Sequence, residues 1–335
     1  MAAIAVSVAL ASVVGLVIGR PSTGHRQPAV ENSSGPRRAN LARLPSPAGV
    51  PGAIADPGLV ATDPRVIHFD VNALASAAWR VTWSSTGSYE SADVERDDFQ
   101  AYAAVARVRT AVPPANSFSA REKGRGGGQT TWSTPSAVDI GGVTGTYTVG
   151  TPHLRAGRPG RADIRIWSLI WQPTPGLWAV VEVQTTSLEH ALAAAGLVRF
   201  DRATRCALPF RIGSPPPGAG MLSCSVSLAD GRATGAGAAG GFAEAELTYG
   251  DGARSLRILV MEDSDGAGDY PRDLRAGPYR VDADPDGRTY TMLVKPLYFT
   301  AVNQAKSPRY SRAQVLDVLG SMRPVGTPAK PETFD

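Results

Sequence analysis

The sequence predicts an α+β protein in which an N-terminal transmembrane helix precedes two tandem modules, each an antiparallel sheet with a C-terminal helix packed on it. Three observations support this fold class. An uncharged apolar run occupies residues 2–19, hairpins of alternating residues occur twice in the rest of the chain, and a similar serine-capped helix follows each hairpin. The hydrophobic content of 43% is typical of a chain with a packed core.

Residues 2–19 contain no charged side chain, and Ser7 and Ser12 are their only polar residues. As a helix they would extend roughly 27 Å, close to the hydrocarbon thickness of a bilayer. A cleavable signal requires a basic region before the apolar core, and here only Met1 precedes it. We therefore expect residues 1–20 to be an uncleaved membrane anchor, with a cleaved export signal as the alternative.

The expected localisation is the cell membrane, as a single-pass protein with an extracytoplasmic body. The arginines that follow the span oppose this orientation, because positive residues favour the cytoplasmic side. A Pro/Gly/Ser-rich linker and two cysteines close enough in sequence to pair favour it. The conflict disappears if the native chain starts upstream with further basic residues.

Composition divides the rest of the chain. Residues 21–64 are rich in proline and poor in large apolar residues, which predicts an extended linker. Two α+β modules are expected at residues 65–203 and 204–324, and a flexible tail at residues 325–335. Much of the net charge of +4 comes from the linker arginines, so we expect no nucleic-acid partner. Few lysines and abundant Ala, Gly and Pro indicate a high-GC bacterium, an actinobacterium.

A repeated segment supports the two modules. Residues 187–199 align without gaps on residues 311–323, with Ser, Leu, Gly and Arg at equal offsets and apolar residues at helical spacing. The two copies begin with Ser187 and Ser311, which suit N-caps, and Gln314 completes a capping box with Ser311. We therefore expect one helix in each copy.

Hairpins precede both helices. Residues 164–171 and 177–184 flank a Pro/Gly turn, and residues 279–283 and 288–294 flank another, with a connection over residues 295–310 before the second helix. Residue alternation and β-branched content predict earlier strands at residues 79–84, 101–112, 138–149, 223–228, 243–249 and 255–261.

These elements carry a resemblance. Glycine-turn hairpins followed by a serine-capped helix ending in Val198-Arg199 or Met322-Arg323 resemble exported α+β domains of the PsbP/Mog1 and lipoprotein-sorting type. Residues 208–212 and the Pro-Pro-Pro-Gly run at 215–218 look like membrane-anchored exported proteins of actinobacteria. The resemblance implies an extracytoplasmic, non-enzymatic binding or accessory role, and it supplies no catalytic motif. We expect no cofactor.

Cys206 and Cys224 are the only cysteines, and they flank a turn-rich segment. Outside the cytoplasm, a disulfide closing this loop would stabilise the fold by roughly 3 kcal/mol. Two free thiols and a metal pair are the alternatives, but no third or fourth ligand lies at zinc-type spacing. We therefore expect a disulfide.

An acidic turn offers a weaker candidate site. Asp282, Asp284, Asp286 and Gly287 match the start of an EF-hand loop, but the twelfth position, which must supply a carboxylate, is Leu293. We interpret the segment as the turn of the second hairpin, with a calcium site as the alternative.

All six tryptophans lie before residue 179. Five of them define a candidate apolar ligand groove in the first module: Trp79, Trp83, Trp167, Trp171 and Trp178. Packing in the core is the competing explanation, because aromatic side chains bury much area.

The leading functional hypothesis is a binding or accessory protein of the bacterial cell envelope, acting on an envelope ligand or a membrane-protein partner. No G-x-S-x-G elbow surrounds any serine, and the four histidines form no pair at helical spacing. The alternatives are an envelope hydrolase whose site is assembled from dispersed residues, and a structural spacer without a binding site.

Overall fold

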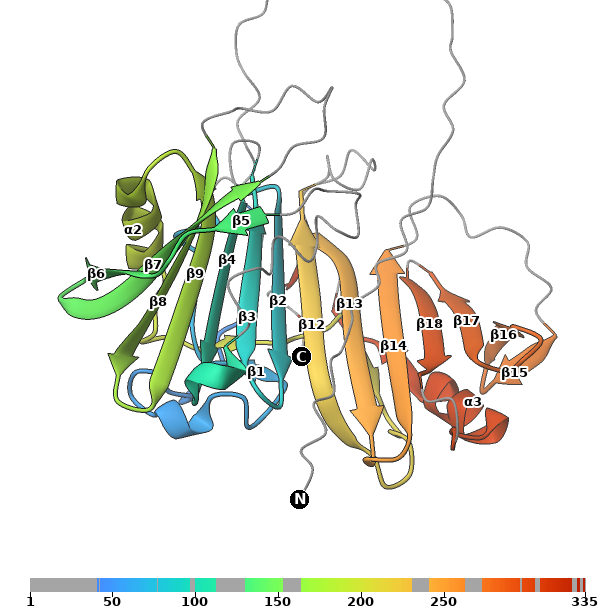
Figure 1. Cartoon of the computed structure of the whole chain (residues 1–335). Helices are drawn as coiled ribbons and strands as arrows, with labels where there is room; N and C mark the ends of the chain where they lie inside the picture. The colour runs from blue at the N-terminus through green and yellow to red at the C-terminus, as the bar shows by residue number, and fades with distance from the viewer. Residues whose placement is uncertain are drawn as a thin grey trace, which may run out of the picture.

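The computed structural model describes residues 41–334, except residues 42, 77, 97–99, 113–129, 153–163, 231–240, 263–272, 296, 305–307, 327–329 and 332–333. One antiparallel sheet of 15 strands dominates this part of the chain (Figure 1).

The sheet has two halves that meet in its middle, and the strands of each half run in the following spatial order from the middle outward. The first half consists of β2 (Arg80–Thr86), β3 (Glu90–Glu95), β4 (Gln100–Ala106), β9 (Leu177–Thr185), β8 (Arg165–Thr174), β7 (Val143–Pro152) and β5 (Thr130–Trp132), with β6 (Ser136–Ile140) also paired to β7. The second half consists of β12 (Gly220–Ala229), β13 (Gly241–Gly250), β14 (Ser255–Glu262), β18 (Leu297–Asn303), β17 (Thr289–Val294), β16 (Tyr279–Ala283) and β15 (Leu274–Ala276).

Shorter elements lie outside this sheet. Two small antiparallel ladders join β1 (Val66–Ile67) to β10 (Thr204–Arg205) and β11 (Phe210–Ile212) to β19 (Met322–Pro324). Within the described residues, the helical elements are α2 (Leu188–Gly196), α3 (Arg312–Gly320) and two 3₁₀ turns, η1 (Pro57–Leu59) and η2 (Arg109–Ala111).

The two halves of the sheet meet at the antiparallel pair β2–β12, where Trp83 lies opposite Val226 and Ser84 opposite Ser225. From this junction each half continues in a similar order, with three strands in chain order followed by later strands in reverse. The sheet therefore continues from the part of the chain before the predicted boundary at residue 204 into the part after it. The domain boundaries derived from the sequence remain a prediction.

The main hydrophobic core lies on one face of the sheet and extends through both halves. Alternate residues of the strands point into it, as in β14, where Leu256, Ile258 and Val260 are buried and the intervening residues are half-exposed. Residues before the first long strand also contribute, among them Ala53 and Val60, which fall within the range expected to be a linker. These buried residues help to hold the N-terminal segment against the sheet.

Both expected helices and the capping box are confirmed. The Ser187 Oγ accepts a hydrogen bond from the His190 amide at 3.3 Å before α2. Before α3, Ser311 accepts from the Gln314 amide at 3.3 Å, and the Gln314 side chain accepts from the Ser311 amide at 2.9 Å. Figure 1 shows the two helices at opposite ends of the sheet, α2 near β8 and β9 and α3 near β15.

The predicted α+β class, with a helix packed over the sheet of each module, is wrong. The protein is predominantly antiparallel β-sheet. Each helix has nine residues and is therefore about 14 Å long, enough to cover about three strands at their usual spacing. Segments outside the large sheet, including residues 44–76 and 197–208, supply much of the remaining apolar cover.

The predicted single-pass membrane localisation also requires correction. Among the residues that the structure describes, no helix combines the length and the apolarity needed to cross a bilayer. The run at residues 2–19, on which that prediction depended, lies outside the described residues.

The sequence patterns located many of the long strands but missed others. β3 and β18 were not expected, and β18 occupies the segment that the sequence analysis treated as a connection before the second helix. As a result, α2 follows β9 directly, whereas α3 follows β18 and not β17. The hairpin β8–β9 therefore corresponds by position to β17–β18, one strand later than the sequence alignment placed it.

Candidate ligand-binding pocket

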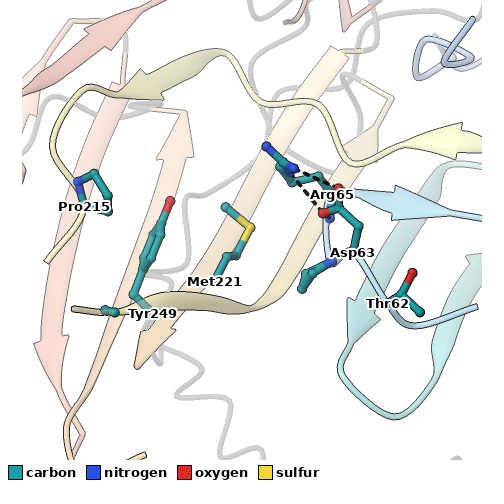
Figure 2. Close-up of a pocket in the computed structure, with 8 residues that line it drawn as sticks. Thr62, Asp63, Arg65, Pro215, Met221 and Tyr249 are labelled. Atoms are coloured by element: carbon teal, nitrogen blue, oxygen red, sulfur yellow. Dashed lines mark hydrogen bonds and ion pairs between the residues drawn. The ribbon is translucent and has the colours of Figure 1, made fainter. Parts of the chain in front are cut away.

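A pocket of about 520 Å³ opens where the N-terminal segment meets the second half of the sheet. Its walls come from three parts of the chain that lie far apart in sequence: residues 62–65, the loop before β12 with the start of that strand, and the end of β13. The lining residues are Thr62, Asp63, Pro64, Arg65, Pro215, Ala219, Met221 and Tyr249 (Figure 2).

A buried carboxylate positions the N-terminal wall. Glu90 points from β3 into the core and has no exposed surface. Its Oε1 accepts hydrogen bonds from the Ala61 amide at 2.8 Å and from His68 Nδ1 at 2.7 Å, and its Oε2 accepts from the His68 amide at 2.5 Å. Ala61 has φ +59°, in the left-handed region that an alanine adopts only when its surroundings hold it there. Glu90 thus fixes both ends of the segment that carries Asp63 and Arg65.

Arg65 and Asp63 form a bidentate ion pair at the pocket. The Arg65 Nε donates to Asp63 Oδ1 at 3.0 Å and Nη2 donates to Oδ2 at 2.8 Å, while the Arg65 amide also donates to Oδ1 at 2.9 Å. The hydrogen bonds from Arg65 lower the pKa of Asp63, although its partial burial acts in the opposite direction. The carboxylate therefore stays ionised and holds the guanidinium at the pocket wall.

Met221 and Tyr249 form the opposite wall. They are a cross-strand pair of β12 and β13, and Figure 2 shows Met221 between Tyr249 and the Arg65–Asp63 pair. Burial raises the pKa of Tyr249, and the positive charge of Arg65 offsets this only in part. The phenol is therefore protonated at neutral pH and is able to donate a hydrogen bond.

The predicted disulfide is confirmed, and it lies beside the pocket. Cys206 and Cys224 are bonded, with their Cα atoms 6.4 Å apart. The Cys206 amide donates to the Arg65 carbonyl at 2.8 Å. The loop closed by the disulfide contains the lining residues Pro215, Ala219 and Met221. The bond therefore links the wall that carries Arg65 to the wall that carries Met221.

The tryptophans proposed for a groove are distributed over both faces of the sheet. Trp83 and Trp171 are buried in the main core, with exposed fractions of 2% and 4%, and Trp167 is half-buried against the same core. Trp178 packs with a smaller apolar cluster on the opposite face. Trp79 is half-buried immediately before β2. The structure thus brings three of the five to one face and places Trp178 elsewhere.

The acidic turn lies between β16 and β17. Asp284 accepts hydrogen bonds from the amides of Arg288 at 2.7 Å and Thr289 at 2.9 Å. Burial acts to raise the pKa of Asp284, but hydrogen bonds, chiefly from these amides, outweigh it and the pKa is lowered. Asp282 ends up in β16 and Asp286 in the turn itself. Across the described residues, no three His, Cys, Asp or Glu side chains are grouped as metal ligands.

The pocket was not predictable from the sequence. Its residues come from positions as far apart as 62 and 249, and no local motif connects them. The one signal that pointed to this region was the cysteine pair, because the expected loop between Cys206 and Cys224 contains part of the lining.

The comparisons with known proteins are sparse. No protein-family description and no curated protein matches the sequence. Among solved structures, MucB in complex with MucA(peri) is similar at 12% identity, over 75% of this chain and 94% of that one, with a TM-score of 0.21. MucB alone is similar at 12% identity, over 76% and 96% of the two chains, with a TM-score of 0.19. TM-scores of this size establish only a loose resemblance.

Proposed function

We propose that this protein is a non-enzymatic binding protein of an extracytoplasmic compartment and that it binds a small ligand in the pocket between the N-terminal segment and β12–β13. The disulfide supports the compartment, because such bonds persist mainly under oxidising conditions. The repeated strand order supports the predicted division of the body at residue 204, and we propose that the pocket, which has lining residues on both sides of this position, lies close to that boundary.

One observation carries the proposal: each of the three walls of the pocket is fixed by a constraint of its own. Glu90 holds the segment before Arg65, the disulfide holds the loop before β12, and the β12–β13 ladder pairs Met221 with Tyr249. A site whose walls are already ordered loses little conformational entropy when a ligand enters, which favours binding.

The lining suits a ligand of mixed polarity. Met221, Ala219 and two prolines present apolar surface, and Arg65 and Tyr249 present polar groups at the same opening. Small-molecule sites commonly combine an apolar surface with a few oriented polar groups in this way.

Methionine methyl groups provide a direct test. The chain contains five methionines; Met221 lines the pocket, Met261 lies half-exposed on the other face of the sheet, and Met292 and Met322 are buried. We would label the methyl groups with ¹³C and add a library of small aromatic acids, amines and alcohols. Binding in the pocket should shift the Met221 signal and leave Met261 unchanged.

A blocking variant completes the experiment. Ala219→Phe places a ring at the pocket opening and should abolish the Met221 shifts, while unchanged Met292 and Met322 signals would show that the core is intact. If no compound moves Met221 selectively, or if the blocking variant binds as well as the unmodified protein, the proposed site is wrong.

A further inference from the structure

We propose, building on the binding function above, that the pocket takes a small amphipathic acid, whose acidic group is bound by Arg65 Nη1 and the Tyr249 hydroxyl and whose apolar body lies against Met221. The hydrogen-bond donors that remain unused at the opening indicate this class of ligand.

Arg65 has donors to spare. Its Nε and Nη2 are occupied by Asp63, whereas within the described residues Nη1 makes no hydrogen bond. The Arg65 side chain is 65% exposed, so this nitrogen is accessible from solvent. A guanidinium nitrogen has no acceptor capacity, and its preferred partners are carboxylate and phosphate oxygens.

Tyr249 provides the second donor. The residue is 7% exposed, and its hydroxyl has no hydrogen-bond partner among the residues that the structure describes. Burial and the raised pKa keep the phenol protonated. Figure 2 shows its hydroxyl and the Arg65 guanidinium on either side of Met221. Two hydrogen-bond donors and the apolar Met221 side chain thus line the same opening, which suits a ligand that joins an acidic group to an apolar body.

Asp63 does not make the pocket a cation site. Its carboxylate already accepts three hydrogen bonds from Arg65, two of them on Oδ1. An incoming amine would find about one unused acceptor site on this carboxylate and would meet the positive charge of Arg65, while an incoming acid finds the unused donors. Because the ion pair is neutral as a unit, we expect the acid to be recognised by directed hydrogen bonds and not by long-range attraction.

Three compounds with one body and different head groups test the inference: 4-phenylbutyrate, 4-phenylbutanol and 4-phenylbutylamine. Titrations followed by the Met221 methyl signal should rank the acid first, the alcohol second and the amine last. Arg65→Gln should weaken binding of the acid about tenfold, the usual effect of losing one hydrogen bond to a charged group, and should change binding of the alcohol much less. Tyr249→Phe should also weaken binding of the acid.

Arg199→Gln is the matched control. Arg199 forms the same bidentate pair, with Asp201, at 3.1 Å and 2.7 Å, but outside the pocket. The Arg199→Gln substitution should therefore leave the affinities for all three compounds unchanged. Arg65→Gln keeps the main-chain carbonyl that accepts from Cys206, and unchanged Met292 and Met322 signals would verify its fold.

The outcomes separate the two proposals. If none of the three compounds moves Met221 and the wider library also fails, the binding function itself falls. If the amine or alcohol binds as tightly as the acid, or if Arg65→Gln binds the acid normally, the pocket remains a binding site but the assignment of an acidic ligand is overturned.

Discussion

Glu90 is the residue on which the N-terminal wall of the pocket depends. A carboxylate with no exposed surface is costly to bury unless its oxygens are bonded, and here they accept three hydrogen bonds from Ala61 and His68. These hydrogen bonds offset the cost of burying Glu90, and they order a segment that has little regular secondary structure of its own.

Glu90→Gln should destabilise the protein by about 3 kcal/mol, because the amide supplies one acceptor oxygen in place of two and introduces a buried donor. Urea unfolding would measure the loss of stability, and the Met221 methyl signal should shift as the pocket wall loosens. Glu95→Gln, at a half-exposed position on the same strand, is the control and should change stability by less than about 0.5 kcal/mol. Equal midpoints for the two variants would contradict the assigned role.

Asp63→Asn should strengthen binding of an amphipathic acid. The amide oxygen can still accept from the Arg65 main chain, but the negative charge is lost and the guanidinium becomes available to the ligand. An exposed ion pair contributes up to about 1 kcal/mol, so we expect an increase in affinity of up to about fivefold. The effect should be present at pH 7, because Asp63 titrates below its ordinary pKa and is charged there.

The same titration with Asp201→Asn is the control, since it removes the acidic member of the equivalent pair outside the pocket. No change is expected. If Asp63→Asn instead binds the acid more weakly, the main effect of Asp63 is to position the Arg65 side chain, and its competition with the ligand for the guanidinium is the smaller effect.

At the residue level, the sequence was informative where interactions are local. Ser311 and Gln314 are three positions apart, and their capping box was predictable from that spacing. Arg65 and Tyr249 approach each other only through the folded sheet, so no spacing rule connects them.

Among the larger elements, the disulfide loop has the clearest energetic role. Its two cysteines are 18 positions apart, and closing a loop of this length stabilises a fold by about 3 kcal/mol in the chain-entropy model. The loop also forms one wall of the pocket, so its effect on stability and its effect on binding are connected.

The double variant Cys206→Ala/Cys224→Ala should lower the free energy of unfolding by about 3 kcal/mol and weaken binding of 4-phenylbutyrate, because the loop that carries Pro215 and Met221 is released. Denaturant unfolding and Met221 titrations at a temperature where the variant is folded would measure both effects. Lower stability with unchanged affinity would show that the bond stabilises the fold without shaping the pocket.

The strands show why element prediction succeeded only in part. β14 alternates regularly between buried and half-exposed residues and was located closely. β3 was not predicted, because Glu90 and Glu95 give this segment the polar character of a loop. In the structure Glu90 is buried and hydrogen-bonded. β18 alternates just as regularly as β14, but it was missed because residues 295–310 were interpreted as a connection before the second helix.

For the whole molecule, the central question is whether the two halves of the sheet unfold together. The predicted fold class treated them as separate helix-covered modules. In the structure, β2 and β12 are paired along seven residues of each strand and one hydrophobic core extends across them. Strand pairing across a boundary is a long-range interaction that no local sequence pattern encodes, which explains why the sequence analysis did not predict it.

The continuity of sheet and core predicts a single cooperative transition. The chain provides a separate probe for each half: all six tryptophans lie before residue 179, and Met221, Met261 and Met292 lie on strands of the second half. Tryptophan fluorescence and methionine methyl signals should therefore give the same midpoint in urea.

Val260→Ala sharpens this test. Val260 is fully buried in β14, in the second half of the sheet, and its truncation should cost about 2 kcal/mol through lost burial and the cavity left behind. If the molecule unfolds as one unit, the fluorescence midpoint should fall by as much as the methyl midpoint, although every tryptophan lies in the other half. A fall confined to the methionine signals would mean that the β2–β12 pair joins two independently stable units, and the pocket would then lie at a boundary able to open without unfolding either side.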